Sequence, residues 1–200
     1  MILEGIMTTL HADGTPNIAP LGPRVDSAFE TMLLRPFQDS DTFTNLKRTR
    51  QGVFHVVDDV ELLARAAVDR LEHLPDYFPA ETVEGVILSD ACRWYALEVT
   101  GIDESAPRAE MQARVVAAGR QRDFFGFNRA KHAVVEAAIV ATRVGILPAD
   151  EILAELARLA SPVEKTGGDV ERRAFEFLCT HVHERLGVAS ARAAHGSHVS

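Results

Sequence analysis

The sequence predicts an α+β protein in which antiparallel strands come first and helices follow. Short runs rich in β-branched and aromatic residues, bounded by Gly, Pro and Asp, recur up to about residue 117. After about residue 127 the apolar residues take helical spacing. With 46% hydrophobic and 25% charged residues, the composition is that of a globular protein. We therefore expect a β domain over 1–126, a helical extension packed on it over 127–188, and a disordered tail over 189–200.

The first two strands are expected to form a hairpin. Residues 2–11 form a strand candidate, and Asp13-Gly14 is a hairpin signal because glycine tolerates positive φ in a tight turn. The partner, residues 16–25, contains three prolines, which cannot donate hydrogen bonds to a sheet. This segment is therefore predicted to be an edge strand or a bulged exit from a barrel.

The remaining elements follow from pattern and from capping residues. Within residues 109–117, apolar side chains alternate with polar or charged ones up to residue 115. This period of two predicts a strand pairing with 94–102, although helix formers are also abundant there. A loop is expected over 161–167, between two segments with helical spacing. Further strands are expected at 31–36 and 52–57, and helices at 40–50, 60–69, 128–143, 148–160 and 168–186.

Charge and cysteine content narrow the class of protein. The net charge of −8 at pH 7 disfavours binding to nucleic acid or to an anionic membrane surface. Cys92 and Cys179 fit neither a disulfide framework nor a zinc site, so we expect no metal. The first residues do not resemble a secretory signal, and the longest apolar stretch, 133–140, is too short to span a bilayer. We expect a cytoplasmic protein.

The segment from 33 to 50 carries the clearest chemical signal. A strand ends at Arg35, and a short loop leads into a helix whose start offers Ser40, Thr42 and Asn45. Free N–H groups at a helix N-terminus favour an anion, and an arginine can add a bidentate contact to phosphate. These residues therefore indicate a phosphate site. The alternative is that the hydroxyls only cap the helix and that the basic residues at 47, 48 and 50 form a solvated face.

Four stretches resemble one superfamily when taken in order. They are T-P-N-I-A-P (15–20), the strand ending in Arg35, D-T-F-T-N-L (41–46) and G-V-F-H-V-V (52–57). Together they are similar to the flavin reductase-like, FMN-binding split-barrel superfamily. The resemblance implies an antiparallel split β-barrel with a C-terminal helical extension.

The same resemblance implies where FMN binds. Thr42 and Asn45 match the D-T-x-x-N element, which lies beside the FMN phosphate in that superfamily. Pro20, Leu21 and Gly22 match the segment that passes along the isoalloxazine ring. Arg35 joins the phosphate site, although members of the superfamily vary at that position.

Most of the chain resembles one branch of that superfamily, catalogued as domain of unknown function 447. The resemblance rests on E-G-I (4–6), on N-I-A-P-L-G (17–22) and on F-F-G-F-N-R-A-K-H-A-V-V-E-A-A-I (124–139). Members of this branch are often associated with methanopterin-linked one-carbon metabolism, which is a contextual association.

The start of the helix at 128 offers a second candidate site. Asn128 is a plausible N-cap, and Arg129, Lys131 and His132 place positive charge where the helix dipole disfavours it. A bound anion would relieve that cost, so Asn128 and Lys131 join the expected cofactor contacts. In the alternative, the upstream phenylalanines anchor the helix while the cations pair with carboxylates such as Glu136.

These observations predict an FMN-binding, flavin-dependent oxidoreductase of unknown substrate. No general acid or base stands out, and hydride transfer to a flavin does not require one. The resemblance also implies a homodimer, with a small-molecule substrate or a nicotinamide donor as partner. The alternatives are a flavin-binding module without turnover, the same barrel holding a deazaflavin or haem, and a helical interaction protein with a scaffolding N-terminal half.

Overall fold

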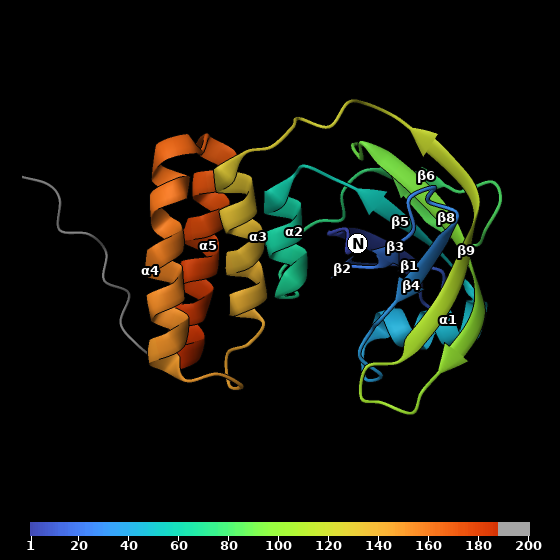
Figure 1. Cartoon of the computed structure of the whole chain (residues 1–200), viewed down its shortest axis with the longest axis horizontal. Coiled ribbons are helices and arrows are strands. Elements are labelled where there is room, and N and C mark those ends of the chain that lie inside the picture. Colours follow the sequence, from blue (N-terminus) through green and yellow to red (C-terminus); the bar gives the residue numbers. More distant parts are fainter. Residues whose placement is uncertain (188–200) are drawn as a thin grey trace, which may run out of the picture. The chain divides into compact units, whose positions relative to one another are not determined.

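The computed structural model describes residues 1–187, which fall into two compact units divided between Phe127 and Asn128. The expected tail at 189–200 lies outside the described residues. The first unit holds all the strands, and the second holds helices α3 to α5 (Figure 1). This order confirms the α+β prediction.

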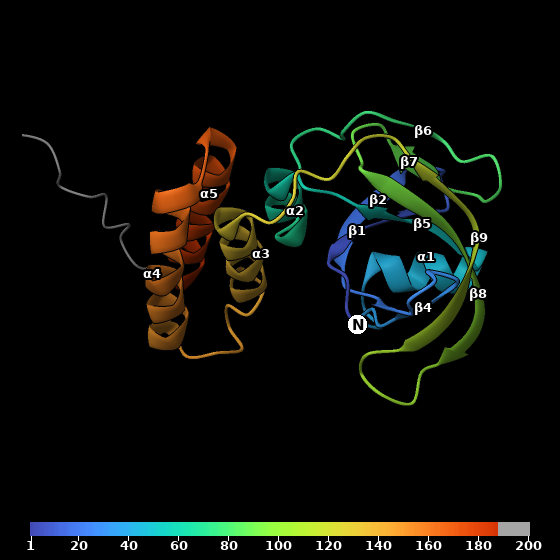
Figure 2. The ribbon, with the colours of Figure 1, turned by 45° about the horizontal axis from the view of Figure 1, so that its top comes forward.

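A curled antiparallel sheet of seven strands forms the first unit, in the order β2-β1-β5-β8-β9-β4-β3. Helix α1 (Asp41–Thr49) lies within the curve of the sheet (Figure 2). The strands are β1 (Gly5–Leu10), β2 (Pro16–Leu21), β3 (Arg24–Val25), β4 (Thr31–Leu34), β5 (Gln51–Val56), β8 (Arg93–Asp103) and β9 (Glu110–Arg120).

The proline-rich segment after the first hairpin supplies both edges of this sheet. It splits into β2 at one edge and β3 at the other, so the prediction of an edge position is confirmed. Chain upstream of β1 then pairs with β3: the Leu3 N–H donates to the Pro23 carbonyl at 3.1 Å, and the Val25 N–H donates to the Met1 carbonyl at 2.9 Å. Because prolines lack the N–H that a central strand needs, this segment suits the two edges.

The inner face of the sheet packs on α1. Phe43 and Leu46 of the helix are buried against side chains such as Met7, Leu34 and Met111. Strand β9 pairs with β8 as predicted, and its residues alternate between this core and the outside. The amphipathic faces of α1 and the strands thus bury one common core.

A second small cluster lies on another part of the sheet, under a hairpin that the sequence did not predict. This hairpin consists of β6 (Tyr77–Pro79) and β7 (Val86–Leu88). Ile87 of β7 packs with Val53 and Ala96 of the large sheet. Helix α2 (Val60–Ala67), capped by Asp59, follows β5.

His55 links three strands from a fully buried position in β5. Its Nε2 accepts the Leu88 N–H at 3.2 Å, so its Nδ1–H must donate to the Ile6 carbonyl, also at 3.2 Å. Burial lowers the His55 pKa from 6.5 to about 4. The ring is therefore neutral at pH 7 and has a structural role.

The second unit consists of α3 (Arg129–Ala141), α4 (Ala149–Thr166) and α5 (Asp169–Leu186). The prediction of a loop over 161–167 is wrong, because α4 continues through Pro162 to Thr166. A proline removes one helical hydrogen bond, but Leu159 and Val163 are buried on either side of it. Tertiary packing thus outweighs the local signal. Within residues 1–187, no helix is long and apolar enough to cross a membrane.

Candidate functional site

The start of α1 has the geometry that an anion site requires. Ser40 is the N-cap: its hydroxyl accepts the Phe43 N–H at 3.2 Å and donates to the Phe37 carbonyl at 2.7 Å. The amides of Asp41 and Thr42 occupy the first two helical positions and have no acceptor within the helix. The expected cap is present, and two N–H groups remain for an anion beside it.

Thr42 and Asn45 belong to a buried polar network that joins α1 to the first hairpin. The Asn17 amide donates to Thr9 Oγ1 at 3.1 Å and to Thr42 Oγ1 at 3.0 Å. The Asn45 amide donates to the same Thr9 oxygen at 3.1 Å. Thr42 and Asn45 are only 4% and 3% exposed. These side chains therefore fix the position of the helix on the sheet, whatever they do toward a ligand.

Arg35 stands just before the loop that leads to α1. Its Nε lies 3.3 Å from Glu110 Oε1, yet this buried nitrogen makes no hydrogen bond. The side chain is 40% exposed, so the outer end of the guanidinium is accessible. Phe37 lies in that loop, and Arg108, from the loop between β8 and β9, lies over its ring, 4.1 Å from the ring centre. Arg35 thus retains donor groups for an acceptor near the helix start.

Two cations later in α1 are engaged elsewhere. Lys47 pairs with Glu104 at 2.7 Å, and Arg48 donates to the Leu10 carbonyl at 2.5 Å. Neither contact involves the first turn of the helix. The expected basic residues are thus divided between Arg35, which precedes the loop before α1 and lies beside Glu110 of β9, and the later turns of the helix.

Pro20, Leu21 and Gly22 lie at the end of β2 and just beyond it. Pro20 and Leu21 pair with Ile6 and Gly5 of β1, and all three residues are half-buried. A Cβ atom at Gly22 would come within 2.9 Å of the Glu4 carboxylate. The absence of a side chain at Gly22 thus leaves room for the Glu4 carboxylate to pack against the backbone.

Asn128 and Lys131 use their polar groups within the second unit. The Asn128 side chain caps α3 by accepting the N–H groups of Ala130 and Lys131, which confirms its predicted capping role. The Lys131 ammonium lies 2.9 Å from Glu171, whose other oxygen accepts the Gly168 N–H at the start of α5. The cation at this helix start is thus balanced by Glu171 rather than by Glu136.

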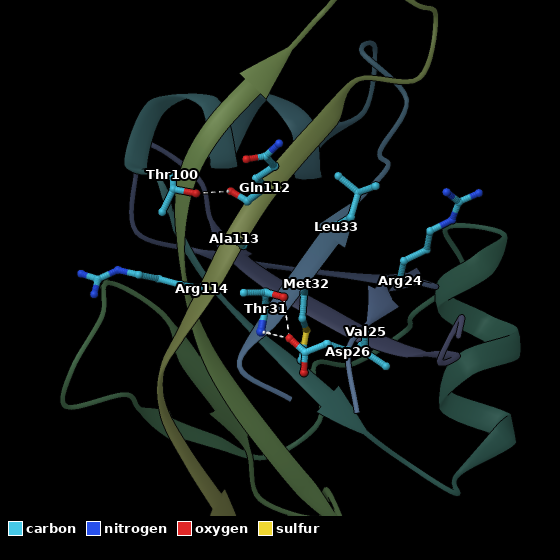
Figure 3. Close-up of a pocket in the computed structure, with 10 residues that line it drawn as sticks. All are labelled: Arg24, Val25, Asp26, Thr31, Met32, Leu33, Thr100, Gln112, Ala113 and Arg114. Carbon is cyan, nitrogen blue, oxygen red and sulfur yellow. Dashed lines mark hydrogen bonds between the residues drawn. The ribbon is translucent and has the colours of Figure 1, made fainter. Parts of the chain in front are cut away.

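A surface hollow with a volume of about 460 Å³ lies on strands β3, β4, β8 and β9. Figure 3 shows Arg24 and Arg114 extending to opposite sides of it. Asp26, at its edge, accepts hydrogen bonds first from the Thr31 hydroxyl and then from backbone amides, which lower its pKa to about 2. None of the residues expected to bind cofactor lines this hollow.

The sequence prediction missed Asn17 and Thr9 as members of the site. Asn17 lies within the N-I-A-P run, so its position in a recognised motif was the available signal. Thr9 gave no such signal, since threonine is a common residue in β-strands. Within residues 1–187, no group of His, Cys, Asp and Glu is arranged to hold a metal ion.

Comparison with solved structures shows which known proteins share this fold. An FMN-bound protein of Methanosarcina mazei is 25% identical, with a TM-score of 0.77 over 90% of this chain and 94% of the other. Flavoredoxin from Methanosarcina acetivorans shares the fold at 12% identity, with a TM-score of 0.53 over 60% of this chain and 68% of the other. An FMN-binding protein from Thermus thermophilus also shares it, at 16% identity and a TM-score of 0.51 over 62% of this chain and 75% of the other. No curated protein matches the chain.

The fold therefore belongs to the flavin reductase-like, FMN-binding split-barrel class, as the sequence predicted. Two family models extend this result to both units. The N-terminal domain of the protein family of unknown function DUF447 matches residues 3–122, and the C-terminal model of the same family matches 128–180. The chain belongs to the DUF447 family.

Proposed function

We propose that this protein binds FMN, with the phosphate at the start of α1 and the isoalloxazine ring along the end of β2. The observation that carries the proposal is its similarity, across nearly the whole chain, to an FMN-bound protein of the same family. Within the proposed site, Arg35 and the amides of Asp41 and Thr42 bind the phosphate, and Ser40 caps the helix beside them.

The donor chemistry around α1 fits a phosphate monoester. Such a group needs several N–H or O–H donors and a positive charge. The two unpaired amides of the first helical turn supply the donors, and the exposed end of Arg35 supplies the charge.

We further propose that the protein is a flavin-dependent oxidoreductase with a small-molecule substrate. FMN supplies the redox chemistry when it is bound, and the chain holds and orients it. For Asn128 and Lys131, cofactor contact stays a prediction from the sequence, since their polar groups have partners within the second unit. A nicotinamide donor, a homodimeric state and a link to methanopterin-dependent one-carbon metabolism remain predictions from the family resemblance.

The proposal is tested first by the ligand that the protein carries. The visible spectrum of the purified full-length protein, with mass spectrometry of whatever denaturation releases, should identify FMN. A deazaflavin or haem spectrum would support the alternative cofactors and contradict the proposal.

A stopped-flow experiment then tests turnover. NADH or NADPH mixed with the FMN-loaded protein should reduce the flavin with saturable kinetics. Bound FMN that neither donor reduces in a saturable way would favour the non-catalytic flavin-binding module.

A further inference from the structure

The network of Thr9, Asn17, Thr42 and Asn45 joins two segments that are separate in the sequence. Asn17 lies in the N-I-A-P strand β2, Thr9 lies opposite it in β1, and Thr42 and Asn45 lie in α1. Asn17 thus connects the strand proposed to pass along the flavin ring to the helix proposed to hold its phosphate, through a single 3.0 Å hydrogen bond to Thr42.

The directions of these hydrogen bonds are constrained by their chemistry. Both contacts of Asn17 come from its amide nitrogen, which has two hydrogens, so both donors are used. Thr9 Oγ1 accepts from Asn17 and from Asn45, which fills its two lone pairs. Thr42 Oγ1 acts as an acceptor toward Asn17, so its hydroxyl proton remains available for a different acceptor.

From this pattern we infer that Asn17 and Thr9 are positioning residues for the phosphate site. They hold the first turn of α1 against β1 and β2 and direct the Thr42 hydroxyl proton away from Asn17. The inference rests on the proposed function, because the phosphate concerned is that of FMN. Neither residue contacts the ligand in this account. Each acts through Thr42 or Asn45.

A purely structural network would have a different signature. It would stabilise the barrel, and its loss would weaken binding of FMN and riboflavin by the same factor. A network that positions the phosphate site affects the two ligands differently, because riboflavin has the same ring system but no phosphate. The ratio of the two dissociation constants separates these roles.

The experiment measures Kd for FMN and for riboflavin with the full-length protein, by flavin fluorescence. Asn17→Ala should weaken FMN binding about tenfold, the factor expected for one lost hydrogen bond, and change riboflavin binding by less than about twofold. Asn17→Asp should weaken FMN further, since a carboxylate accepts the Thr42 proton and adds a negative charge near the phosphate. Thr42→Ser keeps the hydroxyl and should bind FMN more tightly than Thr42→Val does.

Two further variants make the outcome decisive. Thr42→Val removes the hydroxyl at constant shape. Combined with Asn17→Ala, it should weaken FMN binding by less than the product of the two single effects, because both changes break the Asn17–Thr42 hydrogen bond. Gln51→Glu makes the same amide-to-carboxylate change on β5, where Oε1 already accepts the Glu84 N–H, and should leave both dissociation constants unchanged. If Asn17→Ala does not fold, the comparison of Thr42→Val with Thr42→Ser carries the test.

Three results would overturn the inference while leaving FMN binding intact. In the first, Asn17→Ala weakens the binding of FMN and of riboflavin by equal factors. In the second, the effect of the double variant on the FMN dissociation constant equals the product of the two single effects. In the third, Thr42→Val binds FMN as tightly as Thr42→Ser. If the wild-type protein binds FMN no better than riboflavin, the proposed phosphate site itself fails.

Discussion

Protonation of His55 should destabilise the fold, because its neutral ring links three strands. Nε2 accepts the Leu88 N–H, and a proton on that nitrogen would turn an acceptor into a second donor facing an N–H group. Burial lowers the His55 pKa from 6.5 to about 4. The unfolded chain thus binds the proton more readily than the folded one. The stabilisation is complete well above pH 6.5 and is lost as the pH falls toward 4.

The size of this effect follows from the shift. Each unit of pKa difference corresponds to about 1.4 kcal/mol, so the whole shift is worth about 3 kcal/mol. Between pH 7 and pH 4.5, the linkage relation gives a loss of about 2 kcal/mol from His55 alone. Because carboxylates also titrate in this range, the useful quantity is the difference between the wild type and a variant that cannot titrate at position 55.

Urea denaturation at pH 7 and at pH 4.5 measures this difference. His55→Gln should be less stable than the wild type at pH 7, but its unfolding free energy should fall by about 2 kcal/mol less on acidification. His73→Gln removes an exposed histidine and serves as the control, which should keep the wild-type pH dependence. Equal pH dependence in the wild type and His55→Gln would refute the reasoning.

Two other predictions concern ion pairs. The buried Asp58 carboxylate binds Arg122 through both oxygens and also accepts the Phe125 N–H. Arg122→Met should therefore lower the unfolding free energy by about 2 kcal/mol, less than for a fully buried pair because Arg122 is one-third exposed. A urea midpoint equal to that of the wild type would contradict this. Lys131→Met should cost about 3 kcal/mol by leaving the Glu171 carboxylate buried without its cation, and adding Glu171→Gln should recover part of the loss in thermal or urea unfolding. A double variant less stable than Lys131→Met would argue against this pairing.

The sequence predicted those elements whose pattern reflects local physics. Prolines at 16, 20 and 23 identified the edge segment, and the alternation in 109–117 identified β9 as a strand, because backbone donors and side-chain period are local properties. It missed β6 and β7, whose three residues each give no usable period. It also ended α4 too early, since the packing of Leu159 and Val163 is a tertiary property.

For the site, the sequence indicated which residues matter more clearly than what they contact. The helix cap at Ser40 and the cap at Asn128 were predictable, because capping depends on the next three residues alone. The partners of Thr42 and Lys131 were not, since Asn17 and Glu171 lie 25 and 40 residues away in the chain. Only the fold brings these pairs together.

The phosphate site at the start of α1 is tested most directly by titrating the wild-type protein and Arg35→Gln with FMN and with riboflavin. The wild type should bind FMN at least about tenfold more tightly than riboflavin, and Arg35→Gln should remove most of that preference while binding riboflavin as before. Arg158→Gln makes the same substitution at a residue of α4 that pairs with Glu155 and is not among the proposed phosphate ligands, and it should behave as the wild type. Equal affinity of the wild type for the two flavins would contradict the account.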